Sequence, residues 1–130
     1  MIADTTFIID ILIREPDAVR KARELEESGT TIQVTSPTVF ELFAGVALSK
    51  KAEEEKSKIN FVLAGLPQML LDSPSAIAGG LIQGEKTKAG YTIDPEDAMI
   101  AGIAKVSSER VLTRNIKHFS GIEGVAIETY

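Results

Sequence analysis

Acidic side chains recur in this chain where an apolar strand should end or a helix should begin. Asp4 follows the apolar opening residues, while Glu41 and Asp97 each lie near the start of an expected helix. Asn115 follows a later strand in the same way. Because strand ends and helix starts meet at one edge of an open α/β sheet, these side chains could share one crevice. Oxygen ligands with almost no nitrogen and no sulfur suit Mg²⁺ or Mn²⁺ rather than zinc.

Composition limits the class of protein. The chain has 130 residues, of which 44% are hydrophobic and 25% charged, as expected for one globular domain spanning residues 1–130. It has no cysteine and one histidine, which excludes disulfides, thiolate sites and a histidine-rich zinc site. We find neither a signal-peptide pattern nor an apolar run of membrane-spanning length. We therefore expect a soluble, cytoplasmic protein without membrane contact.

The net charge is −5, which disfavours non-specific binding to phosphate backbones. Local positive charge could still contact a phosphate, because Arg114, Lys117 and His118 lie close together in the sequence. Arg114 and Lys117 are therefore candidate phosphate-binding residues. The earlier basic residues between positions 14 and 23 are more simply explained as a solvated helix face.

Short β-branched segments alternate with helical patterns along the whole chain. Several helix patterns begin at a polar cap followed by proline, as at Ser36-Pro37 and Ser73-Pro74. The helix after Pro37 is apolar almost all round, which predicts deep burial. Strands alternating with helices predict an α/β fold with a parallel sheet covered by helices on both faces. The expected strands lie within residues 1–3, 31–35, 66–72, 110–113 and 125–128.

Four short motifs occur in an order and spacing that resemble those of PIN-domain ribonucleases. They are DTT at 4–6, VFEL at 39–42, DAMIA at 97–101 and LTRN at 112–115. Together they cover nearly the whole chain, and they most resemble the VapC-type toxins of prokaryotic toxin–antitoxin pairs. The resemblance implies a three-layer α/β/α fold with a short central parallel sheet. It also implies a homodimer, an antitoxin protein whose C-terminal segment covers the acidic crevice, and RNA as substrate.

The resemblance also assigns the site residues. It places the acidic metal site at Asp4, Glu41 and Asp97, with the fourth acidic position occupied by the amide Asn115. An amide oxygen contributes less to cation affinity than a carboxylate does. The resemblance further implies that neighbouring polar groups orient the ligands, and this second set comprises Thr6, Thr113 and Asp94.

Several of these residues have simpler structural explanations. Asp4 could cap the helix at 5–12, Asp94 could cap the helix that follows it, and Asp97 could complete that cap. Glu41 could form a structural ion pair with Arg114. Two further residues are interpreted as structural or peripheral, namely His118, as a packed or surface histidine, and Asp10, on the first helix.

Metal-dependent hydrolysis of RNA phosphodiester bonds is the function that these features favour. The substrate should be single-stranded or looped RNA, whose backbone can enter a crevice. One alternative is a phosphatase that uses Asp4 as nucleophile, although only Thr113 offers the hydroxyl that such an enzyme needs. The other is a binding module without catalysis, in which Asn115 marks a site that has lost activity.

Overall fold

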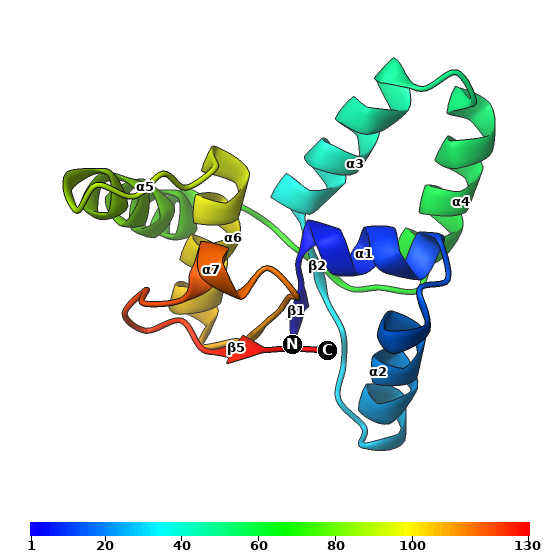
Figure 1. Ribbon diagram of the computed structural model, residues 1–130, viewed down its shortest axis with the longest axis horizontal. Helices are drawn as coiled ribbons and strands as arrows, with labels where there is room; N and C mark the ends of the chain where they lie inside the picture. Colours follow the sequence, from blue (N-terminus) through cyan, green and yellow to red (C-terminus); the bar gives the residue numbers. More distant parts are fainter.

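Short parallel strands run through the centre of the protein, and helices surround them (Figure 1). The computed structural model describes residues 1–130. The strands are β1 (Ile2–Ala3), β2 (Val34–Thr35), β3 (Gln68–Met69), β4 (Val111–Leu112) and β5 (Ile127–Glu128). The helices are α1 (Thr5–Leu12), α2 (Pro16–Glu27), α3 (Ser36–Leu48), α4 (Ala52–Ala64), α5 (Ser73–Lys88), α6 (Pro95–Ser107) and α7 (Ile116–Phe119).

The strand order brings distant parts of the chain to one sheet edge. β1, β4 and β5 pair in that order, and β2 pairs with β3, with every pair parallel. A bridge between Ile2 and Gln33 links the two groups of strands. In the register of β1 and β4, Ala3 lies opposite Leu112. The next residues, Asp4 and Thr113, therefore leave the sheet side by side.

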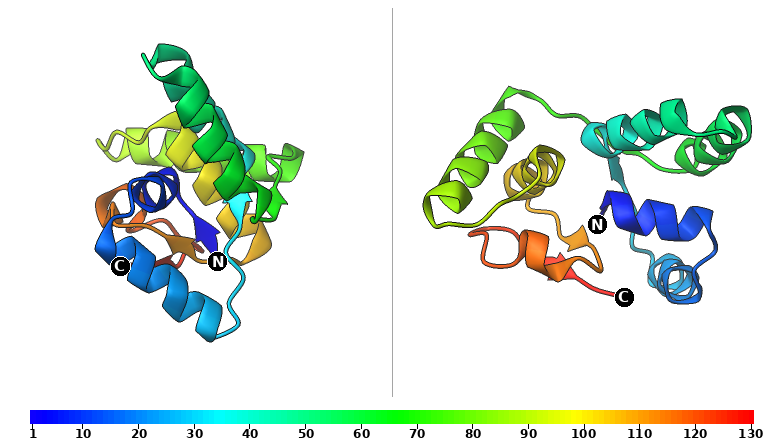
Figure 2. Two further views of the ribbon diagram at one scale, coloured as in Figure 1. Left: turned by 90° about the vertical axis from the view of Figure 1, so that its right-hand side faces the viewer. Right: turned by 45° about the horizontal axis from the view of Figure 1, so that its top comes forward.

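The core has two halves, one on each face of the strands. Ile2 belongs to the half covered by α5 and α6, whereas its neighbour Ala3 belongs to the half covered by α1 to α4. Successive residues of a strand point to opposite faces, so both faces of β1 are covered. Figure 2 shows the same division, with α5 and α6 on one side and α1 to α4 on the other. The predicted α/β fold with helices on both faces is confirmed.

Two helix starts differ from the prediction by one residue. Thr35 and Asp72 cap α3 and α5, because each side chain accepts a hydrogen bond from the backbone N–H three residues later. Ser36 lies inside the helix instead, and its Oγ accepts a hydrogen bond from the Leu71 backbone at 2.9 Å. Ser36 thus ties α3 to the segment after β3.

The prediction that the helix after Pro37 would be deeply buried was wrong. In α3 the side chains of Leu42 and Val46 are buried, whereas Phe40 and Leu48 are exposed. The α3–α4 hairpin projects from the rest of the molecule, so much of α3 lies away from the strands (Figure 1).

None of the helices combines the length and the apolar character that a membrane span requires.

Candidate active site

Asp4 is buried where β1 ends, and it caps α1. One carboxylate oxygen accepts a hydrogen bond from the Phe7 backbone N–H at 2.8 Å. The hydroxyl of Thr6 donates to the same carboxylate at 2.8 Å, and the hydroxyl of Thr113 donates to it from β4. Asp4 therefore does cap α1. Its carboxylate still lies at the edge of the sheet, where the two predicted threonines, Thr6 and Thr113, donate hydrogen bonds to it.

Glu41 lies one turn and a half into α3 and accepts a hydrogen bond from the Thr5 hydroxyl at 2.7 Å. The alternative that Glu41 forms an ion pair with Arg114 was wrong. The Arg114 guanidinium extends instead to Asp10, with 3.1 Å between Nη1 and Oδ2. Glu41 consequently has no arginine or lysine partner in this structure.

Asp97 lies in the first turn of α6, and its Oδ2 is 2.7 Å from Nδ1 of His118. It does not complete a helix cap. Asp94 occupies the capping position without a side-chain hydrogen bond, so the capping explanation fails for its carboxylate as well. His118 is half-exposed and contacts an acid rather than packing in the core.

Asn115 stands at the start of α7, beside Thr113. Its backbone N–H donates to the Thr113 hydroxyl at 2.9 Å, and that hydroxyl in turn donates to Asp4. Lys117 lies elsewhere, in the wall of a cavity of about 680 Å³ between α5, α6 and α7 that also contains Lys86 and Lys105. None of the predicted acidic residues lines that cavity. The structure therefore brings Asn115 next to Asp4 through Thr113 but separates Lys117 from the acids.

The three carboxylates share an unusual electrostatic environment. Burial raises the pKa of Asp4, Glu41 and Asp97, and the hydrogen bonds that each accepts only partly oppose this effect. Mutual repulsion adds to it, because Asp4 and Asp97 both raise the pKa of Glu41. Acids that are costly to ionise and lack a lysine or arginine partner favour a bound cation.

The chemistry of this donor set fits a hard divalent cation, since every candidate ligand atom is an oxygen. In the present conformation no three acidic or histidine side chains converge closely enough to hold one ion. Glu41 is turned toward Thr5 and Asp97 toward His118. Metal ligation by Asp4, Glu41, Asp97 and Asn115 therefore stays a prediction.

A second cavity, of about 420 Å³, opens between α1, α3 and α4 and reaches the acidic crevice. Glu41 and Thr5 line it together with apolar side chains of α1 and α4. The apolar lining residues include Ile9, Leu12, Ile13 and Ile59, and two charged side chains of α4, Glu55 and Lys58, complete this part of the lining.

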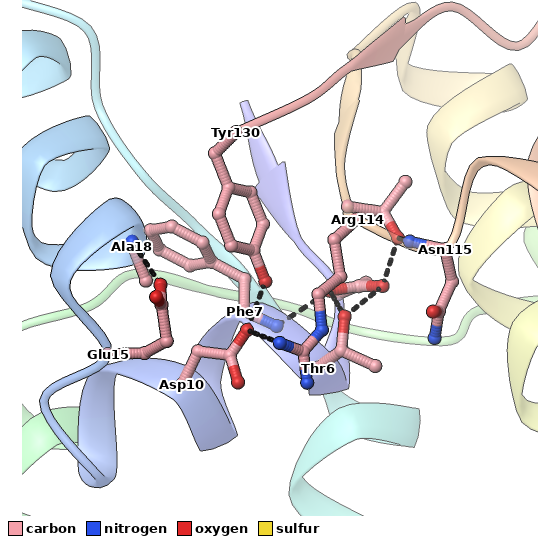
Figure 3. A network of polar contacts seen from close by, with 10 residues as sticks. Thr6, Phe7, Asp10, Glu15, Ala18, Arg114, Asn115 and Tyr130 are labelled. Atoms are coloured by element: carbon pink, nitrogen blue, oxygen red, sulfur yellow. Dashed lines mark hydrogen bonds and ion pairs between the residues drawn. The ribbon is translucent and has the colours of Figure 1, made fainter.

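Asp10 was predicted to be peripheral to the site. It is instead fully buried and contacts both Arg114 and Tyr130 (Figure 3). A signal existed in the sequence, because Asp10 interrupts the apolar run of α1. Nothing local identified its partners, since Tyr130 lies 120 residues further along the chain.

Comparisons with known proteins agree with this architecture. The PIN domain family matches residues 1–124. The chain is 30% identical to a "tRNA(fMet)-specific endonuclease VapC" of Salmonella typhimurium and 28% identical to "Ribonuclease VapC2" of Rickettsia felis, in each case covering 98% of this chain and 95% of the relative. A crystal structure of VapBC2 from Rickettsia felis, bound to a promoter DNA fragment, superimposes with a TM-score of 0.88 at 27% identity, covering 99% of this chain and 97% of that one.

The chain therefore belongs to the PIN domain family, among its VapC-type ribonuclease toxins. The family predicted from the four motifs is confirmed.

Proposed function

We propose that this protein cleaves RNA as a Mg²⁺- or Mn²⁺-dependent endoribonuclease and acts as the toxin of a toxin–antitoxin pair. One observation carries the proposal. Asp4, Glu41 and Asp97 come from three separate segments of the chain, burial and neighbouring acids raise the pKa of each, and no lysine or arginine pairs with any of them, although Asp97 contacts His118. This arrangement is expected of a cation site and is difficult to explain as a device for stability.

Asp4, Glu41 and Asp97 would hold the ion, with Asn115 contributing an amide oxygen or a bound water. When bound, the ion lowers the pKa of a water molecule and neutralises charge that develops on the phosphodiester. Thr6 and Thr113 fix the orientation of the Asp4 carboxylate.

Asp97 contacts His118 in this structure, so its carboxylate would have to turn from His118 toward the ion when the ion binds. The Arg114 side chain is 52% accessible to solvent. Its guanidinium would bind a phosphate of the substrate. Lys117 lines a different cavity, and its contact with a phosphate of the substrate stays a prediction.

The substrate we propose is single-stranded or looped RNA. A base-paired helix buries its bases, whereas a loop presents a flexible backbone that can enter a crevice between helices. Two relatives are named tRNA(fMet)-specific endonucleases, which supports an RNA substrate.

We further propose that an antitoxin protein inhibits this site. Relatives occur in toxin–antitoxin complexes, among them a Klebsiella pneumoniae complex that matches this fold. In this chain the cavity beside Glu41 has apolar walls and three charged side chains, the acids Glu41 and Glu55 and the base Lys58, so its charge is net acidic. A segment with apolar side chains and a basic one would match that lining and would cover the acidic crevice.

Incubating the purified protein with labelled RNA and Mn²⁺ tests the proposal. We expect cleavage by the wild type and loss of cleavage in Asp4→Asn and Asp97→Asn. Asp17→Asn is the matched control, since Asp17 forms an exposed ion pair with Arg20 far from the site. Release of phosphate from a chromogenic ester without RNA cleavage would support the phosphatase instead. RNA binding with no cleavage under any divalent metal would support the non-catalytic module.

A further inference from the structure

Asp10 is a buried carboxylate that the proposed metal site does not use. Its side chain has 0% exposure. Its Oδ2 accepts a hydrogen bond from the Tyr130 hydroxyl at 2.7 Å and lies 3.1 Å from Nη1 of Arg114 (Figure 3). Its Oδ1 has no hydrogen-bond partner. A buried carboxylate with an unpartnered oxygen is costly, so the position of Asp10 calls for a role beyond packing.

Arg114 joins this buried acid to the candidate active site. It follows Thr113, whose hydroxyl donates to Asp4, and precedes Asn115. The guanidinium is anchored through Nη1, while 52% of the side chain stays accessible. A guanidinium has five N–H donors, so most of them remain free for an outside anion. In Figure 3 it lies between Asp10 and Thr6, which itself donates to Asp4.

Tyr130 closes the other side of Asp10. Its ring meets the edge of Phe7 with 5.0 Å between centroids and an interplanar angle of 79°. The hydroxyl is thereby directed at Oδ2, the oxygen that also faces Arg114. Asp10 is thus fixed from one side by Tyr130 and holds Arg114 on the other.

We propose that Asp10 and Tyr130 are positioning residues that hold Arg114 ready to bind a phosphate of the RNA beside the acidic crevice. The inference rests on the proposed RNA cleavage. An unrestrained arginine loses rotamer freedom when it binds, whereas an arginine already anchored at one nitrogen loses less. The planar guanidinium then offers a fixed pair of donors to two phosphate oxygens.

RNA affinity measured on the full chain tests this inference. A fluorescein-labelled single-stranded RNA in EDTA reports binding by anisotropy, without cleavage. We expect Arg114→Ala to weaken binding by about tenfold and to lower the slope of log affinity against log salt by about one. Asp10→Asn and Tyr130→Phe should each weaken binding several-fold. Combining either with Arg114→Ala should add nothing, because all three changes remove one phosphate contact.

Cleavage kinetics in Mn²⁺ give a second readout. The Asp10 and Tyr130 variants should raise KM more than they lower kcat, since a flanking phosphate contact acts on binding. The RNA affinity of Arg114→Lys should lie between those of Arg114→Ala and the wild type. Lysine keeps the positive charge but cannot donate two parallel hydrogen bonds to one phosphate. Glu128→Gln is the control. It removes a 2.7 Å ion pair with Lys21 two residues before Tyr130, and it should change the melting temperature without changing RNA affinity.

Tyr130→Phe keeps the ring contact with Phe7, so it tests the inference even if Asp10→Asn does not fold. Wild-type affinity in folded Asp10→Asn and Tyr130→Phe proteins, or effects that add to those of Arg114→Ala, would overturn the positioning role while leaving RNA cleavage intact. A wild-type protein that neither binds nor cleaves RNA would overturn the proposed function, and this inference with it.

Discussion

At the scale of single residues, the candidate site depends on three acids that the fold makes difficult to ionise. Asp4 follows β1 directly, Glu41 lies in α3 and Asp97 lies in α6, and burial raises the pKa of each. The hydroxyls of Thr113 and Thr5 partly stabilise the charged forms of Asp4 and Glu41. The balance of these effects predicts how the protein responds to pH and to substitution.

The contribution of Asp4, Glu41 and Asp97 to the stability of the metal-free protein should fall as the pH rises. A raised pKa means that the folded state binds more protons than the unfolded chain does, in the window between the ordinary value near 4 and the raised value. The stabilising contribution is complete below that window and is lost as the pH passes through it. Thermal unfolding in EDTA at several pH values measures this loss. Glu41→Gln should flatten the profile, and a profile as steep as that of the wild type would contradict the assignment.

Restoring a fourth carboxylate with Asn115→Asp should tighten Mg²⁺ binding. The Asn115 backbone is linked to Asp4 through the Thr113 hydroxyl, so we expect the new charge to lie near Asp4. Repulsion should destabilise the metal-free protein by about 1 kcal/mol, as Coulomb's law gives for charges several ångströms apart near a protein surface. Calorimetric titration with Mg²⁺ and denaturant unfolding in EDTA measure the two effects. If neither quantity changes, Asn115 faces away from the site.

At the scale of elements, two glycines allow α6 to pack very close to α5. A Cβ on Gly102 would lie 2.6 Å from the Gly79 nitrogen, and a Cβ on Gly79 would lie 2.8 Å from the Ala98 oxygen. Both distances are too short for a real methyl group. The close approach of these helices fixes the start of α6, where Asp97 stands, and therefore one of the three carboxylates.

Gly102→Ala should destabilise the protein by about 1–3 kcal/mol, because the added methyl group forces two backbones apart. It should also weaken metal binding, since Asp97 moves with α6. Gly84→Ala is the matched control on α5, where a Cβ meets nothing within 4 Å, and it should stabilise the helix by up to about 1 kcal/mol. Urea unfolding of both variants tests this, and a harmless Gly102→Ala would show that the helices can separate.

At the scale of the whole molecule, a cation that binds only the folded site should stabilise the fold by mass action. Adding Mn²⁺ should raise the melting temperature of the wild type by a few degrees, and Asp97→Asn should remove most of that shift. Asp94→Asn is the control, because Asp94 makes no side-chain hydrogen bond at the same helix start. The reverse pattern, in which Asp94→Asn removes the shift, would mean that the two acids were assigned the wrong way round.

The molecule also exposes apolar surface on α4 and after β3, where Phe61 and Leu70 have 84% and 70% exposure. We expect a homodimer that buries this surface. Light scattering at micromolar concentration should give twice the mass of the chain, and Phe61→Glu should reduce it to the monomer. Lys56→Ala on the same helix is the control. A wild-type monomer throughout that range would contradict the prediction.

Sequence alone determined the elements, because they depend on neighbours in the chain. Alternating strands and helices, the capping of α1 by Asp4, and the four motifs were readable from local pattern, and the family followed from them. The errors in the helix caps were local as well. The caps of α3 and α5 shifted by one residue to Thr35 and Asp72, since a neighbouring threonine or aspartate competes with serine for the same backbone donors. The burial of α3 was instead decided by the tertiary structure.

Only the tertiary structure decided which polar groups meet. Parallel pairing of β1 with β4 placed Thr113 against Asp4, and the packing of α6 against α7 placed His118 against Asp97. Arg114 contacts Asp10 of α1 rather than Glu41 of α3, and Tyr130 at the far end of the chain contacts the same carboxylate oxygen. Partners more than 100 residues apart leave no periodic trace in a sequence, whereas helices and strands do, because their hydrogen bonds join near neighbours.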